Sequence, residues 1–230
     1  YTNDLHKLTS LFSRLNYNYK EKYLVTGVIR RDGSSRFGAN HRFGVFPSFS
    51  AGWVLSKDDF WKDNAIVNTI NIRGGYGVTG NDAIGDFGYL ALVTGGRNYP
   101  LGTDGAVQIG TSPDAPSNPD LKWETIAMLD IGVDFTTLDN RLTGKFDYYK
   151  KVTTDLYQTF DISLINGTDG LPANFGSMSN EGFEATLAYD LIRTQNSFNF
   201  TIRANGAYNE NRVIDIPTAS GFIDNGQSVV

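Results

Sequence analysis

The stretch at residues 124–135, ETIAMLDIGVDF, alternates apolar and polar side chains. Its odd-numbered positions are Thr125, Ala127, Leu129, Ile131, Val133 and Phe135, and its even-numbered positions include Glu124, Asp130, Gly132 and Asp134. Successive side chains of a β-strand point to opposite faces of the sheet. The period of two therefore predicts a strand with one apolar face and one acidic face.

Seven other segments alternate in the same way, three of them clearly and four more weakly. The eight predicted strands are 11–19, 23–32, 47–55, 69–79, 124–135, 141–150, 182–191 and 198–208. Each has about the length, roughly 9–11 residues, that crosses a bilayer at a tilt. We therefore predict an all-β fold, a transmembrane antiparallel β-barrel, of which this chain forms about eight strands.

The connections between these strands alternate in length. Three are short, at 20–22, 137–140 and 192–197, and three are long, at 33–46, 80–121 and 159–178. Outer-membrane barrels have short periplasmic turns and long extracellular loops. The connection at 56–68 is longer than a periplasmic turn needs. Aromatic residues also fit the two membrane boundaries, with Tyr17, Tyr19, Tyr23, Phe135, Tyr189 and Phe198 beside the short turns and Tyr148 and Tyr208 near the opposite rim.

Composition excludes several classes of function. The chain of 230 residues has a formal net charge of −5 and no basic run, which argues against nucleic acid as a partner. It has no cysteine, so a disulfide scaffold, a thiolate metal site and a cysteine nucleophile are excluded. His6 and His41 lie apart from any second ligand at metal-binding spacing. We expect no catalytic residue, no metal and no cofactor.

Three alternatives to a partial barrel stay open from the pattern alone. A soluble carbohydrate-binding or adhesive β-sandwich would bury the same apolar faces against each other. A complete eight-stranded barrel would pair 11–19 with 198–208. A β-rich hydrolase would need two carboxylates that converge in a cleft. In the barrel interpretation the polar positions face the lumen, namely Arg14, Asn16, Glu124, Asp130, Asp134, Glu184, Asp190, Asn199, Arg203 and Asn205.

Short motifs distinguish among these alternatives. In chain order they are DGSSRFG at 32–38, FPSFSAGW at 46–53, RGGYGVTGN at 73–81, NPDLKWE at 118–124, NRLTG at 140–144 with DYYKK at 147–151, and NEGFE at 180–184. With the segments 11–20 and 23–27 they make the chain resemble the C-terminal barrel region of SusC/RagA-type TonB-linked outer-membrane transporters of the Bacteroidota. The resemblance covers roughly residues 8–210.

The resemblance implies a bacterial outer-membrane location and a role in import of oligosaccharides or peptides. It also implies a SusD/RagB-like surface lipoprotein and the TonB complex as partners, outer-membrane lipid around the wall, and no enzymatic activity. Members of that family carry a signal peptide, a plug domain and about 22 strands, so we expect residues 1–230 to be part of the β-barrel domain of a longer protein.

The long connection at 80–121 is the candidate for substrate contact. It contains eight Gly and four of the seven Pro, and it carries Tyr89, Tyr99 and Asp104. Loops on a rigid scaffold often carry binding residues. We therefore treat Tyr89, Tyr99 and Asp104 as candidates for substrate binding, with a purely structural loop as the alternative.

Overall fold

The computed structural model describes residues 6–61, 66–103, 105–163, 165, 167–168, 170–194 and 198–215. Eight long strands form one antiparallel sheet in the order β1-β2-β3-β4-β9-β10-β13-β14. Their bounds are β1 Leu8–Tyr19, β2 Tyr23–Ser34, β3 Phe43–Val54, β4 Val67–Asn81, β9 Glu124–Thr137, β10 Leu142–Thr154, β13 Ser177–Ile192 and β14 Phe200–Asp215. The eight predicted strands and their antiparallel order are confirmed.

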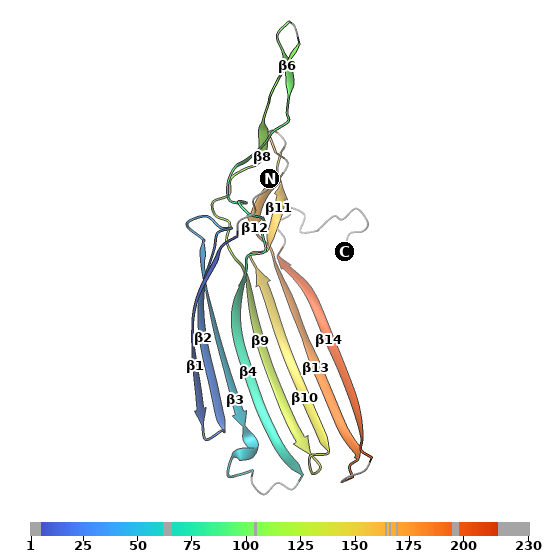
Figure 1. Cartoon of the computed structure of the whole chain (residues 1–230). Helices are drawn as coiled ribbons and strands as arrows, with labels where there is room; N and C mark the ends of the chain where they lie inside the picture. Colours follow the sequence, from blue (N-terminus) through green and yellow to red (C-terminus); the bar gives the residue numbers. More distant parts are fainter. Residues whose placement is uncertain are drawn as a thin grey trace.

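The remaining elements are short and lie in the connections. They are the 3₁₀ helix η1 (Leu55–Lys57), β5 (Leu92–Thr94), β6 (Tyr99–Leu101), β7 (Ala106–Gln108), β8 (Ser112–Ala115), β11 (Tyr157–Asp161) and β12 (Gly170–Asn174). Strands β5 to β8 rise above one end of the large sheet (Figure 1) as two small ladders, β5–β8 and β6–β7. No helix in the described ranges is long and apolar enough to span a membrane.

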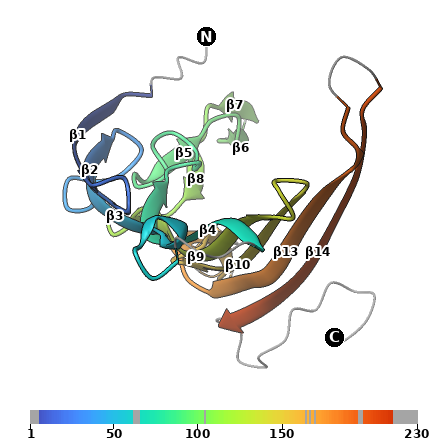
Figure 2. The same ribbon diagram turned by 90° about the horizontal axis from the view of Figure 1, so that it is seen from below.

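The large sheet is curved and open. Seen from below, its strands form an arc with β1 at one end and β14 at the other, and β5–β8 lie over the concave side (Figure 2). Strands β1 and β14 each have one sheet neighbour and do not pair with each other. The alternative of a complete eight-stranded barrel is therefore wrong. The β-sandwich is also wrong, because the long strands form one continuous sheet and, in the part of the chain that the structure describes, no second layer packs on its apolar face.

The apolar side chains of the strands are exposed rather than packed. Leu11 and Leu15 are each 74% exposed, and Phe183 is 60% exposed, on the face that the alternation assigns to lipid. Near the short turns the rings of Tyr19, Tyr23 and Trp53 stack in a row, with centroid separations of 6.4 and 6.2 Å. This row is the aromatic boundary expected beside the short turns.

Glycines allow large side chains to reach across a strand. The Phe135 ring lies where a Cβ of Gly144 would be, beside Leu187 on the next strand. On the polar face Tyr149 passes over Gly182 and donates a hydrogen bond from its hydroxyl to Asn209 Oδ1 at 2.9 Å. A side chain at either glycine would break these three-strand contacts.

Several strands continue beyond their predicted outer ends. Strands β2 and β3 pair as far as Gly33 opposite Phe43, so their connection is 35–42 rather than 33–46. Strand β14 runs to Asp215 although the alternation ends at 208. Strands β11 and β12 form a hairpin that begins at Tyr157, just before the predicted long connection at 159–178, and ends within it at Asn174.

The connection between β3 and β4 is tied to the β1–β2 turn. Lys22 Nζ donates to Asp58 Oδ1 at 3.0 Å, and Trp53 Nε1 donates to Asp58 Oδ2 at 2.6 Å. Lys57 Nζ lies 2.5 Å from Glu21 Oε2. These contacts give the long connection at 56–68 a structural role, because it braces the neighbouring turn.

Candidate functional site

The polar face of the sheet holds a cluster of charged side chains around Arg73 on β4. The guanidinium contacts Asp130 Oδ1 through Nη1 at 3.0 Å and Asp134 Oδ2 through Nε at 3.2 Å, both on β9. Its Nη2 also contacts Asp147 on β10. One side chain thus links three adjacent strands.

The register explains why these residues meet. Arg73 lies opposite Gly132, and Gly132 lies opposite Asp147. Because Gly132 has no side chain, the guanidinium passes over β9, and a Cβ there would lie 2.6 Å from Arg73 Cζ. Asp130 and Asp134 each lie two residues from Gly132 on β9, so both carboxylates point to the face that the Arg73 guanidinium crosses.

The cluster carries more negative than positive charge. Three carboxylates surround one guanidinium, and Glu184 is the register partner of Asp147 on β13. Asn71 Oδ1 and Asp134 Oδ1 are buried acceptors that have no hydrogen-bond partner among the described residues. The arrangement links β4, β9 and β10 and leaves a local excess of negative charge at this place on the polar face.

Convergence of these acids bears on the hydrolase alternative. Asp130 and Asp134 were predicted to face the lumen, and they meet Asp147 there rather than being dispersed along the sheet. All three contact the same guanidinium, whereas a glycosidase pair flanks a bound sugar from two sides. Across the described ranges no group of three or more His, Asp or Glu side chains is arranged to hold a metal ion.

A small hydrophobic core forms where the long connections meet the outer ends of the strands. Its buried members come from segments far apart in the chain, and they are Phe37, Phe46, Ile84, Leu121 and Trp123. The Trp123 ring lies 5.1 Å from that of Phe37 and 5.5 Å from that of Phe46, and its Nε1 donates to Arg42 O at 3.2 Å. The core fixes the β2–β3 and β4–β9 connections to each other.

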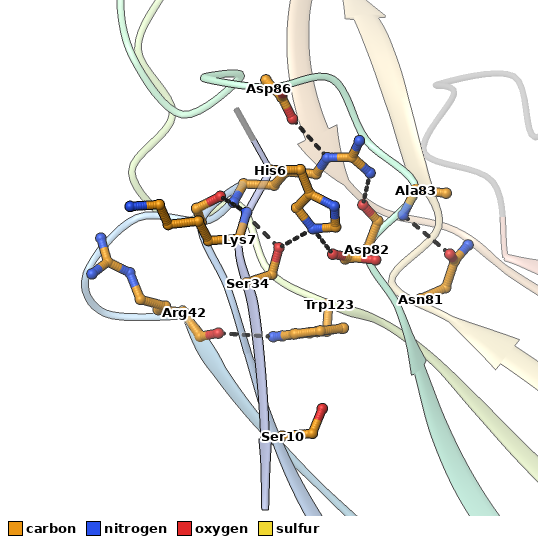
Figure 3. Close-up of polar contacts among 12 residues, drawn as sticks. His6, Lys7, Ser10, Ser34, Arg42, Asn81, Asp82, Ala83, Asp86 and Trp123 are labelled. Atoms are coloured by element: carbon orange, nitrogen blue, oxygen red, sulfur yellow. Dashed lines mark hydrogen bonds and ion pairs between the residues drawn. The ribbon is translucent and has the colours of Figure 1, made fainter. Parts of the chain in front are cut away.

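Polar contacts join the same connections to the start of β1 (Figure 3). His6 Nε2 lies 2.8 Å from Asp82 Oδ2 and 3.3 Å from Ser34 Oγ. Arg36 donates to Asp86 Oδ1 at 2.8 Å and to Asp82 O at 2.9 Å. A catalytic triad places its serine and its acid on opposite ring nitrogens. Ser34 and Asp82 share one nitrogen, so these contacts are a structural junction.

Asn174, at the end of β12, anchors the β10–β13 connection to the same region. Its side chain accepts from Lys122 N at 2.8 Å and donates to Lys122 O at 2.8 Å and Asp155 O at 2.9 Å. Asn118 Nδ2 donates to Pro172 O at 2.7 Å. The β2–β3, β4–β9 and β10–β13 connections are therefore joined into one packed unit.

The three candidate substrate-binding residues lie in different surroundings. Tyr89 is half-buried against the hydrophobic core, and its carbonyl accepts a hydrogen bond from Ser117. Tyr99 is 50% exposed on β6, in the part that projects farthest from the sheet (Figure 1). Asp104 lies outside the described residues. The structure does not bring Tyr89 and Tyr99 together.

The fold and the motifs agree with a known family. A family model described as TonB dependent receptor-like, beta-barrel, matches residues 1–227. The chain therefore belongs to the β-barrel family of TonB-dependent receptors, which places it in the bacterial outer membrane.

Individual relatives narrow the resemblance to the SusC and RagA type. The chain is 39% identical over 221 residues to TonB-dependent receptor P39 of Formosa agariphila, covering 96% of this chain and 21% of that protein. It is 36% identical over 208 residues to TonB-dependent receptor SusC of Bacteroides thetaiotaomicron, covering 90% of this chain and 21% of that protein. The chain spans about a fifth of the length of these curated relatives.

Among solved structures, the RagAB peptide importer in its open-open state superposes with a TM-score of 0.82. The sequences are 28% identical, and the match covers 93% of this chain and 23% of that chain. The chain is thus a barrel segment related to SusC and RagA.

Proposed function

We propose that residues 1–230 form part of the wall and outer loops of a TonB-driven importer for oligosaccharides or peptides. In this proposal the rest of a longer protein supplies the plug, the TonB-contacting segment and the remaining strands. A SusD/RagB-like lipoprotein covers the outer end, and this segment itself has no enzymatic activity and binds no cofactor.

The observation that carries the proposal is the open, one-layered sheet. Its apolar face is exposed, its polar face carries the Arg73 cluster, and β1 and β14 each leave one edge unpaired. Unpaired edges are avoided in membrane barrels because backbone groups in lipid need partners. Closure by further strands would satisfy both edges and would enclose a lumen wide enough for a plug.

The outer connections support a role in binding rather than simple closure. The hydrophobic core and the Asn174 contacts hold three connections together, and β5–β8 project from that packed unit. Exposed side chains on the projection include Tyr99 and, at 88% exposure, Ile109. In this proposal Tyr99 and Asp104 contact substrate or lipoprotein, and Tyr89 positions the loop that carries them.

Growth of a strain that lacks the full-length receptor tests the proposal. We expect loss of growth on one class of nutrient, defined oligosaccharides or oligopeptides, and normal growth on the corresponding monomers. The full-length gene should restore growth, whereas a copy without its TonB-contacting segment should not. Unchanged growth on both classes, or restoration by the uncoupled copy, would contradict TonB-driven import.

A further inference from the structure

A pocket of about 390 Å³ lies at the outer end of β1, β2 and β3, beneath the β4–β9 connection. Its lining combines two cations with hydroxyl groups and three aromatic rings. The residues that matter here are Lys7, Ser35, Arg42, Phe43, Phe87 and Tyr89. This pocket is separate from the Arg73 cluster and borders the His6 junction, with which it shares Ser34.

The cations of the pocket are available to a ligand. Lys7 and Arg42 are exposed, and their side chains extend to the same side, away from His6 and Asp82 (Figure 3). Among the residues that the structure describes, neither side chain has an acidic partner within ion-pair distance. The neighbouring acids are already engaged, namely Asp32 with Arg30 at 2.7 Å and Asp86 with Arg36 at 2.8 Å.

A third cation, Arg31, lies beside the pocket against one of its lining rings, Phe43. Arg31 stacks over the Phe43 ring, with 4.3 Å between its Cζ and the ring centroid. The Phe43 ring lies close on Gly33, where an added Cβ would be 2.5 Å from Phe43 Cε1. The ring therefore lies against the backbone of β2, with the Arg31 guanidinium over it.

The position of the pocket on the sheet defines its ligand. In the register, the lining residue Gly33 pairs with Thr9 on β1 and with Phe43 on β3. These three lie two residues from Arg31, Leu11 and Val45, which pair in the same way, so all six positions share the lipid-facing side. Leu11 is 74% exposed and Val45 54% exposed. The pocket thus lies where the apolar band ends and cationic side chains begin, which is the level of lipid headgroups.

We propose that this pocket binds the headgroup of a phosphate-bearing lipid in the outer leaflet. Lys7 and Arg42 contact the phosphate, since guanidinium and ammonium groups form short charge-assisted hydrogen bonds to phosphate oxygens. The acyl chains follow Leu11, Ile29 and Val45 down the sheet. The proposal depends on the outer-membrane location of the family and not on the imported substrate.

Native mass spectrometry of the full-length receptor in detergent tests the site. The probes are lipid A with two phosphates, lipid A with one phosphate, phosphatidylcholine as a zwitterionic lipid, and inorganic phosphate. The variant is Lys7→Gln with Arg42→Gln. Its matched control, Lys20→Gln with Arg97→Gln, removes two exposed cations at the β1–β2 turn and on the projecting part. Heat-modifiable migration on gels verifies that each variant is a folded barrel.

We expect the Lys7/Arg42 variant to lose at least about tenfold in affinity for two-phosphate lipid A, and the control to stay within about twofold. One-phosphate lipid A should bind more weakly than the two-phosphate form. Equal binding by the variant and the wild type would overturn the proposal. Binding of inorganic phosphate or of phosphatidylcholine as tightly as lipid A would overturn it too, since the site would then recognise a free anion or acyl chains alone.

Discussion

Substitution of Gly132 by alanine tests the account of the Arg73 cluster. The backbone of Gly132 does not have a positive φ, so alanine fits its backbone conformation. The obstacle is steric, because the new Cβ would collide with Asp147 Oδ1 and would lie 2.6 Å from Arg73 Cζ and 2.8 Å from Arg73 Nη1. The guanidinium must move away from β9, and its contact with Asp147 on the far side is lost.

Three terms set the expected magnitude. Crowding at a packed position costs about 1–3 kcal/mol. Loss of the Arg73–Asp147 contact costs about 0.2–1 kcal/mol, since both side chains are partly exposed. Alanine in place of glycine returns about 0.4–1 kcal/mol through the unfolded chain. Together these ranges give about 0.2–3.6 kcal/mol, and we expect Gly132→Ala to destabilise the barrel by about 2 kcal/mol, near the middle.

Gly27→Ala is the matched control, because nothing lies within 4 Å of a Cβ at Gly27 on β2. The measurement is guanidinium chloride unfolding of the full-length receptor in detergent micelles, followed by tryptophan fluorescence. We expect Gly27→Ala to be neutral or slightly stabilising.

A double-mutant cycle with Arg73→Ala measures how much of the Gly132→Ala effect depends on the Arg73 side chain. Without the guanidinium, the added methyl meets mainly the Asp147 side chain, whose carboxylate has lost the ion pair with Arg73 that held it there. Gly132→Ala should then cost less than about half of its effect in the wild type. An additive double mutant, or a Gly132→Ala variant as stable as Gly27→Ala, would refute the idea that glycine is needed there for Arg73.

Three further predictions follow from the turns, the loops and the sheet as a whole. Hydrogen bonds from Lys22 and Trp53 lower the pKa of Asp58. The contribution of Asp58 to stability is therefore complete above the usual Asp pKa of about 3.9 and is lost as pH falls through the lowered pKa. Asp58→Asn should lower the denaturant midpoint of unfolding at pH 7 and should make that midpoint less sensitive to acid pH; an unchanged pH slope would contradict this. Asn174→Ala removes the three side-chain hydrogen bonds to Lys122 and Asp155; we expect faster amide exchange at 120–123 and 155–157 with unchanged exchange in β9, and equal protection in both proteins would show that other contacts hold the connection. Residues 1–230 expressed alone in water should aggregate, because the exposed apolar face and the two open edges have no cover; a monomer that stays soluble and unfolds cooperatively, measured by analytical ultracentrifugation and thermal unfolding, would count against the barrel-wall assignment.

The alternation predicted the strands well inside the membrane and poorly outside it. Lipid on one side and a polar lumen on the other impose a period of two, and this constraint ends at the membrane surface. Beyond it, the lipid-side positions become charged, as in Lys150, which pairs with Glu181 at 3.0 Å. The predicted ends at 150 and 208 therefore fall short of the observed ends at Thr154 and Asp215.

The Arg73 cluster was not predicted, because its partners are brought together only by register across three strands. Arg73 and Asp147 are 74 positions apart in the sequence, and no local spacing relates them. One signal was present, since Gly132 interrupts the acidic face between Asp130 and Asp134. A glycine at such a position marks a place where a neighbouring side chain crosses the strand.

The motifs that identified the family supply buried residues to the connections as well as residues to the strands. DGSSRFG supplies Phe37, FPSFSAGW supplies Phe46, and NPDLKWE supplies Leu121 and Trp123, so segments from three motifs build one buried core. Without that core, the connections at the outer end would be held only by exposed polar contacts, which contribute little in water. The wall strands need only alternation to remain in lipid, and many sequences satisfy that requirement. A packed core that joins distant connections requires particular side chains at particular positions. This is why these motifs identify the family more specifically than the alternation of the strands does.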